Sequence, residues 1–186
     1  VKVARSTPDP ADVSKAAEIL VNATNPVIYA GQGVHYAKAW EELKELAELL
    51  EEPVTTSLEG KSAFPETHPL SLGSGGRALP KPVHHFIQNA DVIFGIGCSF
   101  FATGFGIQFP KGKTVIHSTL DPLDLDNTVE VTQPLVGDAK LTLAALIPEV
   151  RALVDDGGRG RADGIAAEIA SIRDEWITDW RPRLDD

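Results

Sequence analysis

The chain has 186 residues, of which 42% are hydrophobic, and a formal net charge of −10. This length and composition are typical of one globular domain with a sizeable core. The acidic balance argues against a nucleic-acid backbone as partner, and no apolar run approaches the ~20 residues of a membrane span. The single cysteine, Cys98, excludes an internal disulfide and a cysteine-based zinc cluster, and it favours a reducing cytoplasm.

The first residue is Val1 rather than methionine, and no basic and apolar leader opens the chain. We therefore expect a fragment or a processed product of a longer protein. Residues 1–10 are polar and contain two prolines that keep a helix from beginning earlier, so we predict an incoming linker there. A helix over residues 10–23 follows, with its apolar residues on one face.

The first predicted core strand is VIYA at residues 27–30, and a helix is expected from about Tyr36 to Leu50. Gly31 and Gly33 stand between them. Backbone amides at such a strand-to-helix turn can hold an anion. The turn lacks the third glycine of the dinucleotide fingerprint, so a tight turn without a ligand is the competing interpretation.

Residues 53–57 are rich in β-branched side chains, which predicts a second strand. The LEGK sequence at 58–61 is no P-loop, because only one glycine precedes its lysine. Residues 66–76 are expected to form a long loop, and loops of this length are usually functional or mobile. A helix over 82–90 comes next. The five histidines of the chain show no metal-ligand spacing.

The central feature of the sequence is the run from Asp91 to Gly106, DVIFGIGCSFFATGFG. Its apolar part, 92–97, is typical of a fully buried parallel strand, and a loop rich in glycine and hydroxyl groups follows. Ligands in open α/β sheets bind beyond the carboxyl ends of the strands, so we expect a site here. The loop has no neighbouring base, and Cys98 is better explained as a small core residue than as a nucleophile. We therefore predict no catalytic residue.

Two later strands are predicted, over residues 113–118 and within 134–138. Asp121 follows the first of these strands. It either accepts a hydrogen bond from a ribose hydroxyl or closes a turn with Pro122. The alternation of five or six strands with helices predicts an α/β fold with a parallel, doubly wound sheet.

Asp138 is predicted to cap a helix over residues 139–154, which Pro148 should kink or split. Residues 155–164 (DDGGRGRADG) are predicted to break the chain before a last helix from Ile165 to about Trp180. That last helix either packs on a neighbouring domain or folds back on this one. The inward face of the earlier helix is expected to hold Leu141, Ala144, Ala145, Ile147 and Leu153.

Five segments occur in a characteristic order and spacing: NPVIYAGQGV at 25–34, the run at 43–73, NADVIFGIGCSF at 89–100, VIHSTLDP at 115–122 and PLVGDAKLTLAAL at 134–146. As a set they resemble the central domain of thiamine-diphosphate-dependent enzymes of the acetolactate synthase type. The resemblance covers about Asp12 to Val150. It implies a three-layer, Rossmann-like α/β domain with about six mainly parallel strands, helices on both faces and the DHS-like NAD/FAD-binding topology.

The resemblance also implies a domain organisation. Residues 1–10 would be the incoming linker, 11–156 the central domain, and 157–186 a C-terminal helix with the outgoing linker. The partners would be the flanking thiamine-diphosphate-binding domains of the same chain, in a cytoplasmic homodimer or homotetramer, with no nucleic acid and no membrane. The parent enzyme would act on 2-oxo acids by decarboxylation or carboligation.

In this family a glutamate upstream of the central domain meets the cofactor, and a downstream GDG…N motif holds its diphosphate and Mg²⁺. The sequence Gly137-Asp138-Ala139 is not that motif. We therefore expect thiamine diphosphate and Mg²⁺ in the parent only, and no activity in this chain.

Some relatives hold FAD in the central domain, others an adenine nucleotide such as ADP, and others nothing. The resemblance places a nucleotide crevice at eight residues: Gly31, Gly33, Leu58, Gly97, Ser99, Asp121, Gly137 and Asp138. Ser99 and Thr103 replace two loop arginines of the family, and Thr119 replaces an acidic residue. Because a lost arginine removes a cation that would face a dinucleotide, an empty structural domain is favoured over bound FAD or ADP.

A self-standing Rossmann-like protein that binds NAD or an adenine nucleotide, of the sirtuin-like type, is the alternative. It would need a complete phosphate loop and a catalytic histidine in the crevice. His117 is the only histidine at a predicted strand end, and its loop lacks partners for catalysis.

Overall fold

The computed structural model describes residues 5–154 and 158–185. Its strands are β1 (Pro26–Ala30), β2 (Val54–Thr56), β3 (Ser71–Ser74), β4 (Val92–Ile96), β5 (Thr114–Thr119) and β6 (Gln133–Val136). Its helices are α1 (Pro10–Asn22), α2 (Gly33–Ala37), α3 (Trp40–Leu50), α4 (Lys81–Asn89), α5 (Ala139–Leu153) and α6 (Ala162–Leu184), with a 3-10 turn, η1, at Pro122–Asp124. None of the described helices is both long enough and apolar enough to cross a membrane.

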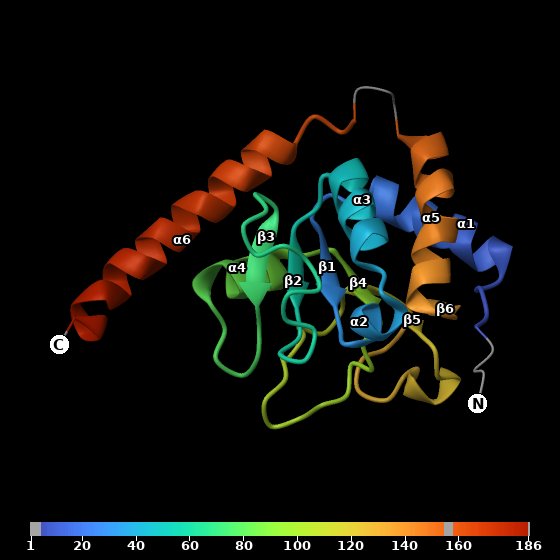
Figure 1. The fold of residues 1–186 in the computed structure, drawn as a ribbon, viewed down its shortest axis with the longest axis horizontal. Coiled ribbons are helices and arrows are strands. Elements are labelled where there is room, and N and C mark those ends of the chain that lie inside the picture. The colour runs from blue at the N-terminus through green and yellow to red at the C-terminus, as the bar shows by residue number, and fades with distance from the viewer. Residues whose placement is uncertain (1–4, 155–157, 186) are drawn as a thin grey trace.

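All six strands pair in parallel, in the order β3-β2-β1-β4-β5-β6. This is the order of doubly wound dinucleotide-binding folds, in which the chain turns back at the centre of the sheet. Here that point lies between β1 and β4, whose carboxyl ends are adjacent (Figure 1). The predicted α/β fold with a parallel sheet is confirmed.

Two hydrophobic cores lie on opposite faces of the sheet because side chains alternate along each strand. In β1, Ile28 and Ala30 join the core beneath α1, α3 and α5, whereas Val27 and Tyr29 join the core beneath α4. Ile169 of α6 belongs to the second core. Helices therefore cover both faces, which confirms the expected three layers (Figure 1).

The predicted central strand is confirmed as β4, in which all five residues are buried. Asp91 fixes the start of this strand, because its carboxylate accepts hydrogen bonds from the backbone amides of Thr24 (2.7 Å) and Asn25 (2.9 Å). Partial burial alone would raise the pKa of Asp91, but these amide donors outweigh it and hold the pKa below its usual range. The carboxylate therefore links the residues that precede β1 to the residue that precedes β4.

The single helix predicted from Tyr36 to Leu50 is wrong. The chain forms α2 and α3 instead, joined at Lys38, which has a left-handed conformation (φ 54°). The amide of Ala39 donates to the carbonyl of Val34 and closes α2. The left-handed residue at a helix end is usually glycine and sometimes asparagine, so a lysine at this position does not predict the break.

The prediction of an uninterrupted loop at 66–76 is also wrong, because it contains the edge strand β3. Gly73 adopts a positive φ of 86°, and the pairing with β2 shifts register between Val54 and Thr55. A short strand with this irregularity has no clear alternation in its sequence. At the outer edge, Arg173 donates to the carbonyl of Ser71 at 2.6 Å.

Helix α5 runs through Pro148 as one element, so the predicted split does not occur. Pro148 lies on the exposed face, where water can satisfy the carbonyl of Ala144 that loses its helical partner. The predicted inward face is partly wrong. Ile147 is buried, but Ala144 and Leu153 are exposed, and the buried stripe consists of Ala139, Thr142, Leu143, Leu146, Ile147 and Val150. The predicted cap by Asp138 is confirmed, because its carboxylate accepts the amides of Lys140 and Leu141.

Helix α6 begins at Ala162, three residues before the predicted start. Its first half folds back on the domain, where Ile169 is buried, and Lys81 pairs with Glu175 just past the midpoint at 2.6 Å. Its second half extends beyond the sheet toward the C-terminus, with Trp180 exposed (Figure 1). Residues 155–157 of the predicted break lie outside the described residues.

Candidate nucleotide crevice

Close backbone contact between two loops forms the floor of the site. The amide of Gly31 donates to the carbonyl of Ile96 (2.9 Å), and the amide of Gly33 donates to the carbonyl of Gly97 (2.8 Å). A Cβ atom at Gly31 would lie 2.3 Å from the Gly97 oxygen, and Gly97 itself has a positive φ of 61°. These glycines therefore let the turns after β1 and β4 touch each other.

Above this floor lies a crevice of about 780 Å³ at the carboxyl edge of the sheet. A volume of this size is typical of small-molecule sites. The structure brings together all eight predicted residues along its walls: Gly31, Gly33, Leu58, Gly97, Ser99, Asp121, Gly137 and Asp138. They come from the loops that follow β1, β2, β4, β5 and β6, which end at the same edge.

The two predicted aspartates already serve as local caps. Asp121 accepts the amide of Leu123 at 3.0 Å. One of its carboxylate oxygens therefore closes the turn with Pro122, as one of the two interpretations of the sequence expected. Asp138 caps α5, and the guanidinium of Arg5 lies 4.0 Å from its carboxylate. Neither interaction removes these residues from the crevice wall.

Aromatic rings form the deep wall of the crevice. Tyr29 contacts Phe109 edge-on with centroids 5.0 Å apart, and Phe100 packs against both rings. Phe100 lies over Gly95, where a Cβ atom would come within 2.2 Å of the phenyl ring. Ser99, which stands before it, accepts the amide of Phe101 at 3.3 Å. The loop after β4 was noted in the sequence for its glycine and hydroxyl groups, but the deep wall that it helps to form is largely aromatic.

Neither the cysteine nor the buried histidine is placed for chemistry. Burial raises the pKa of the Cys98 thiol, but Cys98 is only half-buried: it packs against the second core and also lines the crevice. His117 is fully buried, its Nε2 lies 2.8 Å from the carbonyl oxygen of Cys98, and burial lowers its pKa. His117 does not line the crevice, so the catalytic histidine required by the alternative function is not found there. Across 5–154 and 158–185, no three histidine, cysteine, aspartate or glutamate side chains could hold a metal ion.

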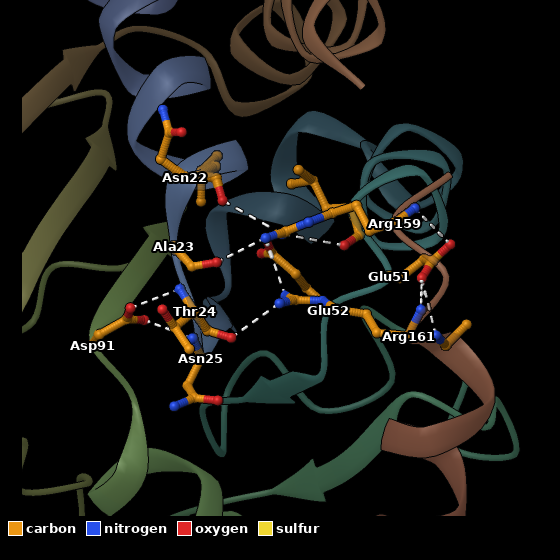
Figure 2. A network of polar contacts seen from close by, with 12 residues as sticks. Asn22, Ala23, Thr24, Asn25, Glu51, Glu52, Asp91, Arg159 and Arg161 are labelled. Atoms are coloured by element: carbon orange, nitrogen blue, oxygen red, sulfur yellow. Dashed lines mark hydrogen bonds and ion pairs between the residues drawn. The ribbon is translucent and has the colours of Figure 1, made fainter. Parts of the chain in front are cut away.

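The sequence analysis did not predict a buried charge cluster, which lies next to the residues that precede β1 and β2 (Figure 2). Glu52 has no exposed surface, and its Oε1 lies 3.2 Å from Nη1 of Arg159 and 3.9 Å from Nη2 of Arg161. Burial raises the pKa of Glu52 to about 8, against the opposing effect of the two arginines, with a small further contribution from Asp91. Burial therefore favours the protonated form of Glu52, whereas the two arginines favour its ionised form.

The same cluster holds the chain segment that enters α6. The carboxylate of Glu51 accepts the backbone amides of Arg159, Arg161 and Ala162. The Arg159 guanidinium donates to the carbonyl of Ala23 at 2.7 Å, and that of Arg161 to the carbonyl of Thr24 at 3.0 Å. A sequence signal existed, because two glutamates at a helix end and two arginines in a glycine-rich break are complementary.

The comparison with protein families decides the assignment. The family described as "Thiamine pyrophosphate enzyme, central domain" matches residues 13–146. The chain belongs to this family. The matched range runs from α1 into α5 and contains all six strands, so the resemblance noted in the sequence is confirmed.

Among curated relatives, this central domain is similar to acetolactate synthases. It is 40% identical over 146 residues to the "Probable acetolactate synthase large subunit" of Methanocaldococcus jannaschii, covering 77% of this chain and 25% of the relative. It is 34% identical over 175 residues to the acetolactate synthase isozyme 3 large subunit of Escherichia coli, covering 92% of this chain and 29% of the relative. The chain thus spans about a quarter of the length of these relatives.

A solved structure with the same fold is the benzoylformate decarboxylase of Polynucleobacter necessarius. The two share 28% sequence identity with a TM-score of 0.68, and the match covers 81% of this chain and 29% of the other. The fold of the thiamine pyrophosphate enzyme central domain is therefore common to relatives of different activity.

Proposed function

We propose that this chain is the non-catalytic central domain of a larger enzyme that uses thiamine diphosphate and Mg²⁺ to decarboxylate or ligate 2-oxo acids. The observation that carries the proposal is the family match over residues 13–146 together with the relatives, of which the chain covers about a quarter. Two further observations support a non-catalytic role: burial raises the pKa of the Cys98 thiol, and His117 does not line the crevice.

The domain organisation follows from the same proposal. Residues 1–10 would serve as the incoming linker, 11–156 as the central domain and 157–186 as the C-terminal helix and outgoing linker. Flanking domains of the same polypeptide would supply the groups that bind thiamine diphosphate and Mg²⁺. The exposed end of α6, with Ile177 and Trp180, is suited to pack on such a domain.

The parent is proposed to be a cytoplasmic homodimer or homotetramer, and the role of this domain would be to hold the catalytic domains in register. A single cysteine agrees with a reducing compartment. This role needs no nucleotide in the crevice, and FAD or ADP is a less favoured occupant. A self-standing NAD-binding protein is not favoured, because His117 is buried against Phe100 and the Cys98 carbonyl.

A chimera tests the role of the domain. Residues 10–154 would replace the matching central segment of the Escherichia coli relative, and the affinity for thiamine diphosphate with Mg²⁺ would be measured. We expect a dissociation constant within about tenfold of the parental protein, because the cofactor ligands come from the flanking domains. A chimera that is folded but has lost cofactor binding would contradict the proposed spacer role.

A further inference from the structure

The mouth of the crevice is apolar and open to water. Five large hydrophobic side chains that line it are at least half exposed: Tyr36 (78%), Phe105 (76%), Phe101 (62%), Leu120 (57%) and Leu58 (50%). Isolated exposed hydrophobic residues are ordinary, but several of them around one concave site are typical of a binding surface. Three of the five are aromatic, which favours a flat ring as the ligand.

The charge of the crevice is negative. Glu59, Asp121 and Asp124 line it, and no ion pair within the described ranges joins any of the three to a cation. Asp138 also lines it and lies 4.0 Å from Arg5, which is the only lysine or arginine on the described part of the wall. An anionic ligand would therefore meet three uncompensated carboxylates.

Five backbone amides on the crevice wall are already engaged in hydrogen bonds within the protein. Those of Gly31 and Gly33 donate to carbonyls of the neighbouring turn, and the amide of Gly97 donates to Ser118 at 2.9 Å. On the far wall, the amides of Gly137 and Asp138 donate to the carbonyls of Thr119 and Ser6, each at 2.9 Å. A phosphate-binding loop needs amides that are free to point at the ligand, and these five amides are not free.

The crevice therefore does not fit the pyrophosphate of FAD or ADP, although its size and aromatic walls suit a ring system. We propose that it binds a flat heteroaromatic compound with hydroxyl groups and no phosphate, of the nucleoside or riboflavin class, and that it rejects the phosphorylated forms. This inference concerns the chain's own crevice and does not depend on the proposed role as a central domain.

The carboxylates supply acceptors for the ligand's hydroxyl groups. One oxygen of Asp121 is taken by the amide of Leu123, which leaves the other free to accept. Glu59 is exposed at the crevice wall. Hydrogen bonds to ionised acceptors are roughly twice as strong as neutral ones, so a ribityl or ribose chain gains from these groups while a phosphate is repelled.

Matched ligand pairs test the proposal on the 186-residue chain. Riboflavin would be compared with FMN by fluorescence anisotropy, and adenosine with ADP by calorimetry, because each pair differs only in phosphate. We expect saturable binding of riboflavin or adenosine, and an affinity at least about tenfold lower for the phosphorylated partner. Equal or tighter binding of FMN or ADP would overturn the proposal, and so would the absence of saturation by all four compounds at about 1 mM.

Substitutions in the crevice test separately the effect of its carboxylates and the effect of its aromatic side chains on ligand binding. The double variant Glu59→Gln, Asp121→Asn removes two of the charges that repel a phosphate. It should therefore reduce the ratio of the riboflavin affinity to the FMN affinity by at least about threefold. Phe101→Ala should weaken the binding of both riboflavin and FMN and leave the ratio of their affinities unchanged. Glu41→Gln, on the exposed face of α3 and away from the crevice, is the control and should change neither value. A ratio unaffected by the double variant, with an unchanged melting temperature, would rule out the carboxylates as the source of selectivity.

Discussion

At the scale of the residue, Gly31 shows how one missing side chain lets two loops meet. A methyl group there would lie 2.3 Å from the backbone oxygen of Gly97 and could not be relieved by a side-chain rotation. We expect Gly31→Ala to lower the free energy of unfolding by roughly 2–4 kcal/mol, since the backbone of one turn must move. Urea denaturation measures this loss.

Gly104→Ala is the matched control for this substitution. No heavy atom lies within 4 Å of a Cβ atom built at Gly104. Its expected change in the free energy of unfolding is within about 0.5 kcal/mol of zero. Similar losses for both variants would contradict the close loop contact as the reason for a glycine at position 31.

Glu52 makes stability depend on pH in a defined direction. The folded state raises its pKa from 4.5 to about 8, so the folded chain keeps a proton that the unfolded chain releases. The stabilisation from this proton is complete below about pH 4.5 and is lost as the pH rises toward 8.

Glu52→Gln tests this dependence, because glutamine keeps a neutral oxygen beside Arg159 and cannot titrate. The free energy of unfolding would be measured by urea denaturation at several pH values from 5 to about 8. We expect the variant to lose less stability across this range than the wild type. Parallel curves for the two proteins would show that Glu52 is ionised in the folded state.

At the scale of the element, α6 combines an anchored half with a free half. Ile169 is 1% exposed in the core beneath α4, whereas Ile177, two turns later, is 40% exposed. Ile169→Ala should cost about 2–4 kcal/mol of unfolding free energy, and Ile177→Ala less than about 0.5 kcal/mol. Urea denaturation of both variants checks the difference. Equal effects would mean that α6 is not anchored through Ile169.

Strong hydrophobic patterns made most elements predictable. The five buried residues of β4 and the capped start of α5 follow from apolar runs and turn chemistry in the sequence. The break at Lys38 and the short strand β3 did not, because a left-handed lysine and an irregular edge strand depend on tertiary contacts. The rotation of α5 was partly missed, since its apolar residues are numerous enough to support more than one inward face.

At the scale of the whole molecule, the crevice could be predicted because parallel strands bring their following loops to one edge. The eight predicted residues converge there for that reason. The sequence did not predict which backbone amides of these loops donate to carbonyls within the protein. It also did not predict that Phe101 and Phe105 are exposed at the mouth of the crevice. The cluster of Glu52 with Arg159 and Arg161 joins residues more than 100 positions apart, so their complementary charges are visible in the sequence but no local pattern pairs them.

The central claim is that this domain belongs to a thiamine pyrophosphate enzyme without itself binding the cofactor. The most direct measurement is calorimetric titration of the 186-residue chain with thiamine diphosphate in the presence of Mg²⁺, alongside an assay for turnover of pyruvate as a 2-oxo acid. We expect no saturable heat up to about 1 mM cofactor and no turnover. Saturable, Mg²⁺-dependent binding accompanied by turnover would contradict it and would place catalytic groups within this chain.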